Sequence, residues 1–154
     1  MLIREADEAD AELMSEVLEE LIAAGKRTKP SDPSFVLSHY IEHPDRLHCF
    51  VAVGDKNRIL GLQSLKLARE GNPYGTPIGW GIIGTHVRPS AARMGIGSRL
   101  FAATLSAARQ AKLPAIEAYI GAENDAALNY YEALGFSTNR RSDGAICKAY
   151  QLTG

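Results

Sequence analysis

Arg93-Met94-Gly95-Ile96-Gly97-Ser98 is the stretch of this 154-residue chain from which the rest of the fold can be inferred. Before it, residues 82–87 (IIGTHV) are short and rich in β-branched side chains, and Arg88-Pro89 follows, which predicts a strand that ends there. After it, apolar or small residues recur at the spacing of a helix with one buried face: Ile96, Leu100, Phe101, Thr104, Leu105 and Ala108. The glycines therefore lie where a strand passes into a helix.

Glycine at such a junction lets a ligand approach the main chain and permits unusual dihedral angles. The first amides of a helix have no partner within it, and the helix dipole favours an anion beside them. We therefore predict that the loop around Gly95 and Gly97 binds phosphate; a purely structural turn is the alternative.

A second strand and helix follow. Residues 115–120 (AIEAYI) read as a strand, and residues 125–134 as a helix that Asn124 opens and Gly135 ends. On that helix Asn124, Ala127 and Tyr131 share one stripe. We expect a polar ligand to lie along it.

The chain runs in the order strand, Arg93-Met94-Gly95-Ile96-Gly97 turn, helix, strand, Asn124 and then Tyr131-Glu132-Ala133-Leu134-Gly135-Phe136. This order resembles that of the GNAT superfamily of acyl-CoA-dependent N-acyltransferases. The match is specific over residues 82–136. It implies an α/β fold with a mixed, twisted central sheet of about seven strands flanked by about four helices on both faces. The ligand cleft would lie where two neighbouring parallel strands diverge.

The resemblance also implies roles for individual residues. The main chain of Thr85 and Val87 would bind pantetheine, the Asn124 side chain would bond to it, and the Tyr131 phenol would protonate the departing thiolate. Coenzyme A pyrophosphate would be held by the amides of the loop, which are those of Arg93, Met94, Gly95, Ile96, Gly97 and Ser98. Ala92 stands where the family has Gln or Arg, so the main chain is expected to carry most of this binding.

No general base can be singled out. A phenol with a reference pKa near 10 suits Tyr131 to donate a proton. For the base, His86 is a candidate, although strand alternation places it on the opposite face from Thr85 and Val87. Glu117 and Tyr119 are others, and a water relay or an amine that binds neutral would need none.

We expect an N-acetyltransferase that moves an acetyl group from acetyl-CoA, as cosubstrate and without a metal, to a primary amine of a small molecule or peptide. The amine would attack directly in a ternary complex. A non-catalytic module that senses acyl-CoA is the first alternative, and a nucleotide-binding domain is the second.

Composition fits this expectation. Hydrophobic residues make up 45% and charged residues 23% of the chain, the formal net charge is -1 and the pI is near 6.4. The chain has no apolar run of membrane-spanning length and no secretory-signal pattern. Together these features predict one cytoplasmic domain over residues 1–154 with no nucleic-acid or membrane partner. Cys49 and Cys147 are expected to be reduced and buried. The resemblance adds a possible homodimer.

The remaining sequence predicts scaffold. We expect a strand at 2–6, a helix capped by Asp7, a shorter helix over 35–41, a hairpin of 48–53 with 59–65, an irregular loop at 69–77, and two last strands, the clearer at 145–150. The basic loop over 26–33 is either solvated or, in the family's arrangement, borders the acceptor pocket and meets an acidic group there. Tyr74 is either a packed loop aromatic or part of that pocket.

Overall fold

A mixed sheet of seven strands in the order β1-β2-β3-β4-β5-β7-β6 forms the centre of the computed structural model, which describes residues 1–153. The strands are β1 (Leu2–Glu5), β2 (Arg46–Val53), β3 (Ile59–Leu67), β4 (Gly81–Val87), β5 (Ala115–Gly121), β6 (Ser137–Ser142) and β7 (Ala145–Gln151). The helices are α1 (Ala11–Ala23), α2 (Pro33–Val36), α3 (Ile96–Gln110) and α4 (Asp125–Leu134). The predicted fold is confirmed.

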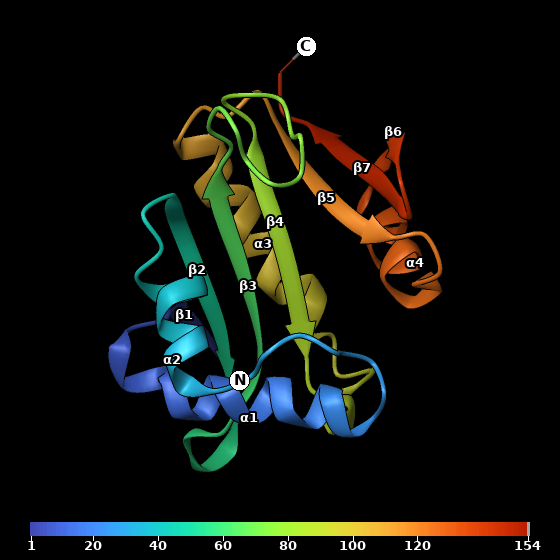
Figure 1. Ribbon diagram of the computed structural model, residues 1–154. Coiled ribbons are helices and arrows are strands. Elements are labelled where there is room, and N and C mark those ends of the chain that lie inside the picture. Colours follow the sequence, from blue (N-terminus) through green and yellow to red (C-terminus); the bar gives the residue numbers. More distant parts are fainter. Residues whose placement is uncertain (154) are drawn as a thin grey trace.

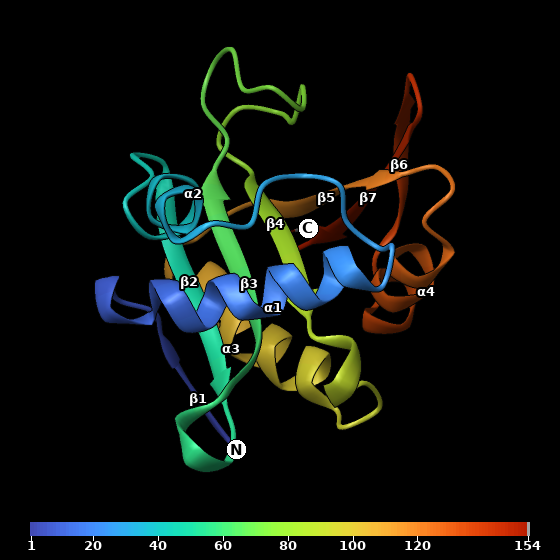
Figure 2. The same cartoon turned by 60° about the horizontal axis from the view of Figure 1, so that its bottom comes forward.

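Helices cover both faces of the sheet (Figures 1 and 2). On one face, α1 and α2 bury Met14, Leu18 and Val36 against Val51 and Leu62 of the sheet. On the other face, α3 and α4 pack on the sheet through a second set of buried side chains, which includes Leu65, Ile83, Phe101, Ile116, Tyr131 and Phe136. Each of these fully buried large side chains contributes about 1.5–3 kcal/mol of hydrophobic stabilisation.

Residues close to the ends of the helices determine several of their boundaries. Asp7 caps the short helical turn η1 (Glu8–Asp10) that leads into α1, and Gly135, with φ of 107°, ends α4. The predicted helix over 35–41 is instead two pieces, α2 and the π-helical turn η2 (Leu37–Ile41). Within residues 1–153 no helix has the length and apolarity that a bilayer crossing requires.

The contact between β4 and β5 is the feature that positions the site. It is parallel and covers only three residue pairs, from Gly81 with Ile116 to Ile83 with Ala118. Beyond Ile83, β4 continues beside β3, while β5 continues beside β7. Figure 1 shows the two strands spreading apart from there. The predicted divergence of neighbouring parallel strands is therefore present.

Candidate active site

Thr85 and Val87 expose main-chain groups in the gap between β4 and β5. The Arg88 amide donates to the Leu60 carbonyl at 3.0 Å, which fixes the alternation of the β3–β4 ladder. Because hydrogen-bonded and non-bonded pairs alternate in an antiparallel ladder, Thr85 and Val87 turn their main-chain groups away from β3. On that side β5 has stopped pairing at Ala118. These groups are thus placed to bind an extended ligand.

The loop before α3 presents a row of amides without acceptors. Arg93 and Gly95 have positive φ angles of 67° and 73°, which turn the chain into the helix. In the described part of the chain, none of the main-chain N–H groups of residues 93–98 donates to a protein acceptor. The start of α3 has no side-chain cap and no acidic residue in its first turn, whereas Asn124 caps α4. This arrangement suits an anion.

The two loop glycines serve different purposes. A Cβ atom on Gly95 would meet nothing within 4 Å, so its positive φ is what demands glycine there. Gly97 is ordinary helix, and a Cβ atom on it would lie 2.6 Å from Cε1 of Tyr130. The prediction that Gly97 lacks a side chain so that a ligand can approach is therefore incomplete, because the Tyr130 ring also requires this space.

Gly97→Ala is expected to destabilise the protein by about 1–3 kcal/mol, because the methyl group must displace Tyr130. Denaturant unfolding measures the change. Gly121→Ala is the matched control, since a Cβ atom there would meet nothing within 4 Å. Equal stabilities of the two variants would show that Tyr130 moves aside without cost.

Two phenols of α4 reach across to the sheet and to α3. The Tyr131 hydroxyl lies 2.8 Å from the Thr85 hydroxyl, and the Tyr130 hydroxyl donates to the Gly97 carbonyl at 2.8 Å. The Gln63 amide donates to both the Thr85 and the Tyr130 hydroxyl, at 2.9 and 3.1 Å. This network holds Tyr131 at the edge of the gap. Gln63 was not predicted, because its role depends on the β3–β4 register.

Tyr131 is more enclosed than its stripe on the helix suggested. The residue is 4% exposed and its ring centroid lies 5.1 Å from that of Phe136, so Tyr131 is buried, and along the stripe only its hydroxyl, beside Thr85, is left to meet a ligand. Burial raises the pKa of the phenol above its ordinary value, which keeps it protonated at neutral pH. Asn124 is exposed, and its Oδ1 accepts from the Ala127 amide at 3.1 Å, as a helix cap does.

A pocket of about 180 Å³ lies on the opposite face of the sheet, beside the start of the gap. His86 lies on this face, as alternation predicted, and its Nε2 is 3.1 Å from the Tyr40 hydroxyl. Burial and the nearby cations Arg27 and Lys29 lower the pKa of His86 to about 3, so its imidazole is neutral. The pocket is lined by Arg27, Lys29, His39, Tyr40, Ser64, Lys66, Tyr74, Ile82, Ile83, Gly84, His86 and Tyr119. The basic loop and Tyr74 therefore border a pocket.

Glu117 does not have the freedom of a general base. It is fully buried and accepts from the Thr76 hydroxyl at 2.9 Å, the Asn139 amide at 3.0 Å, and the Arg140 guanidinium at 2.7 and 3.1 Å. Arg140 also donates to the Tyr74 carbonyl at 2.6 Å. The carboxylate thus joins β6 to the loop between β3 and β4, and these bonds count against its role as a general base.

Glu117→Gln is expected to cost about 3–5 kcal/mol of stability, because Arg140 loses its buried partner. Steady-state turnover of the folded fraction should remain near that of the unchanged protein. Exposed Glu123→Gln is the control for stability. A folded Glu117→Gln protein without turnover would instead support Glu117 as the general base.

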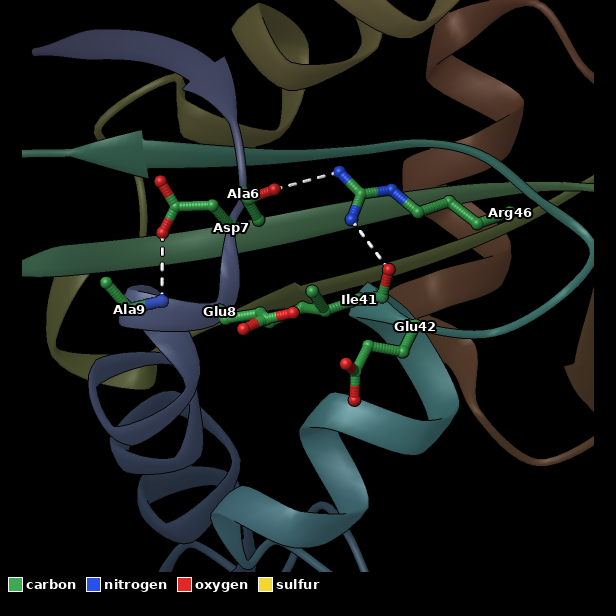
Figure 3. Close-up of a pocket in the computed structure, with 7 residues that line it drawn as sticks. All are labelled: Ala6, Asp7, Glu8, Ala9, Ile41, Glu42 and Arg46. Carbon is green, nitrogen blue, oxygen red and sulfur yellow. Dashed lines mark hydrogen bonds between the residues drawn. The ribbon is translucent and has the colours of Figure 1, made fainter.

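A larger and more open hollow, about 630 Å³, lies between the turn that precedes α1 and the end of η2 (Figure 3). Its one cation, Arg46, donates to the carbonyls of Ile41 and Ala6 at 2.8 and 2.9 Å. The side chain thereby fastens two chain segments together. None of the predicted site residues lies there, and we assign the hollow to the scaffold.

Comparisons with known proteins agree with this geometry. The model of the GNAT acetyltransferase family matches residues 12–136. Three solved structures share the fold. The GNAT domain of S. lividans PAT has TM-score 0.80 and 18% identity, covering 97% of this chain and 89% of that one. A GCN5-related N-acetyltransferase from Kribbella flavida has TM-score 0.77 and 20% identity, covering 98% and 97%.

The third is the paiA N-acetyltransferase from Thermoplasma acidophilum in complex with coenzyme A, with TM-score 0.75 and 16% identity, covering 98% of each chain. A comparison with curated proteins gave no match. At these identities the structures show a shared fold.

Proposed function

Because the chain belongs to the GNAT family of acetyltransferases, we propose that it transfers the acetyl group of acetyl-CoA to the primary amine of a small molecule or peptide. The gap between β4 and β5, with the uncapped start of α3 beside it, carries the proposal. A structural neighbour that holds coenzyme A supports this choice of donor.

The donor would be held chiefly by main-chain groups. Thr85 and Val87 supply N–H and C=O groups for the amides of pantetheine, and the amides of residues 93–98 supply donors for the pyrophosphate. Arg93 is exposed next to these amides and adds positive charge. Asn124 stands at the start of α4, where its Oδ1 serves as the cap and its amide N–H groups remain to donate.

In the transfer step the amine nitrogen forms a bond to the thioester carbon, and the carbon–sulfur bond breaks. A main-chain amide near Val87 would donate to the carbonyl oxygen as negative charge develops there. Tyr131 gives its proton to the leaving sulfur and regains one from water or from the amine. Its raised pKa keeps that proton available at neutral pH.

The proton that leaves the amine also needs an acceptor. His86 borders the pocket, but with a pKa of about 3 it is too weak a base for an ammonium group. We therefore favour an amine that enters neutral or passes its proton to water.

Calorimetric titration with acetyl-CoA tests the donor site, with a nicotinamide dinucleotide as control. Saturable binding of acetyl-CoA is expected. Release of thiol in the presence of an amine then tests transfer. Binding without transfer to any amine would favour a sensing module, and absence of binding would overturn the proposal.

A further inference from the structure

The pocket on the α1–α2 face is cationic. Arg27 and Lys29 line it and are positively charged, and no carboxylate lines it. Burial lowers the pKa of Lys66, the third cation of the lining, to about 8, so most of its amine is still protonated at pH 7. The two histidines of the pocket add no charge, because burial lowers the pKa of His39 to about 4 and that of His86 to about 3. A molecule that enters the pocket therefore meets positive charge without a protein anion to balance it.

Lys66 differs from the other buried charged residues. Arg88, Glu117 and Lys148 each have an oppositely charged partner, at 3.2, 2.7 and 3.6 Å, and Asp10 pairs with Arg4 at 2.8 Å. Lys66 is 8% exposed, and within residues 1–153 no carboxylate lies within 4.0 Å of its amine and no acceptor bonds to it. Its ammonium instead lies over the Tyr40 ring, 5.6 Å from the centroid.

The carboxylates nearest in the fold are already engaged. Asp45, whose charge acts on Lys66, is paired with Arg69 at 2.6 Å. Glu117, two strands away across Ile82 of β4, is already bonded to Arg140 and its other donors. The Lys66 side chain is therefore largely buried, lines the pocket and has no protein carboxylate to neutralise it, and an unpaired cation in a pocket is a candidate ligand site.

We infer that the acceptor of the proposed transfer is a small amine that also carries an oxyanion, a carboxylate or a phosphonate, and that Lys66 binds this oxyanion. The inference rests on the proposed function for the presence of an acceptor. Arg27 and Lys29, which also line the pocket, attract the same group.

The strand register brings Lys66 close to the proposed place of transfer. Lys66 is opposite Ile82, and the gap that would admit the thioester begins after Ile83, the next residue of β4. The pocket volume of about 180 Å³ is below the roughly 300–1,000 Å³ of sites for drug-sized ligands. Small amino acids and aminophosphonates fit this volume.

Matched acceptors test the inference. L-leucine is compared with isopentylamine, and aminoethylphosphonate with ethylamine, each at saturating acetyl-CoA with detection of released thiol. The ratio of kcat/KM within each pair is measured in the unchanged protein and in Lys66→Met. Comparing ratios cancels the different basicities of the amines. The two pairs separate carboxylate from phosphonate as the preferred oxyanion.

In Lys66→Met we expect KM for the oxyanion-bearing acceptor to rise roughly 10- to 100-fold, the effect of losing one charge-assisted hydrogen bond. KM for acetyl-CoA and kcat for the plain amines should stay unchanged. Lys66→Arg should recover part of the loss. Lys148→Met is the control, because Lys148 is equally buried but pairs with Glu132 outside the pocket.

A binding measurement without acetyl-CoA separates this inference from the proposed function. Aminoethylphosphonate should raise the melting temperature of the unchanged protein but not that of Lys66→Met, which should itself be at least as stable, because it loses an unpaired buried charge. If the kcat/KM ratio within each acceptor pair, or the rise in melting temperature, were the same in the unchanged protein and in Lys66→Met, the oxyanion site would be overturned. The proposed transferase function would not be affected. A loss of kcat with the plain amines as well would also overturn the oxyanion site, because it would show that Lys66 takes part in the transfer step.

Discussion

Tyr131→Phe is expected to lower kcat by roughly 100-fold or more while leaving the affinity for acetyl-CoA near its original value. The phenol is the proposed proton donor to the thiolate, and loss of a general acid typically costs 10²–10⁴ in rate. The ring remains, so the core contact with Phe136 is kept, and one hydrogen bond to Thr85 is lost. That bond contributes about 1 kcal/mol to stability. Steady-state kinetics and calorimetry measure the two effects separately.

Tyr130→Phe is the matched control, one residue earlier on α4. Its hydroxyl bonds to Gly97 and Gln63, and the ring is likewise packed, so the loss of stability should be similar. Its kcat should change little, because the hydroxyl serves the scaffold. If both variants lost kcat equally, the network as a whole, and not the Tyr131 proton, would be responsible. If Tyr131→Phe kept full kcat, the assignment of Tyr131 would be wrong.

Gly95→Glu is expected to weaken acetyl-CoA binding on the order of 100-fold, since a carboxylate would be placed a few ångströms from the pyrophosphate. The side chain has room, because a Cβ atom at Gly95 meets nothing within 4 Å. The positive φ of 73° adds a strain of about 1–2 kcal/mol, which lowers stability but does not itself repel the ligand. Calorimetric titration of the folded variant measures the effect.

Two further variants separate charge from strain. Gly71→Glu carries the same carboxylate at an exposed position with φ of 77° and open space, in the loop between β3 and β4. It should lose a similar amount of stability and bind acetyl-CoA normally. Gly95→Ala should show the strain with a smaller loss of affinity. Unchanged affinity in folded Gly95→Glu would mean that the amides of residues 93–98 do not hold the pyrophosphate.

Much of the fold was predictable because its signals are local. Gly135 ends α4 and Asn124 caps it, as their residue types indicated. The run of β-branched residues before Arg88 marked β4, and the spacing of apolar residues after Gly95 marked α3. Each of these depends on residues within a few positions of one another.

The site was less predictable because its contacts join distant segments. Glu117 is neutralised by Arg140 on β6 and bonded by Thr76 in a loop, which no local pattern could indicate. The need for Gly97 comes from Tyr130, 33 residues later. Lys66 attracted no notice in the sequence, because the absence of a partner is visible only when every neighbour has been placed.

The early end of the β4–β5 ladder also has a consequence for solubility. It creates an unpaired strand edge inside the sheet, and such edges are where other chains add and aggregates begin. On the proposed function, bound acetyl-CoA would occupy this edge and satisfy its hydrogen-bonding groups. The ligand would then stabilise the native state by mass action and shield the edge as well. The concentration of acetyl-CoA would therefore affect the lifetime of the folded protein as well as its rate of turnover.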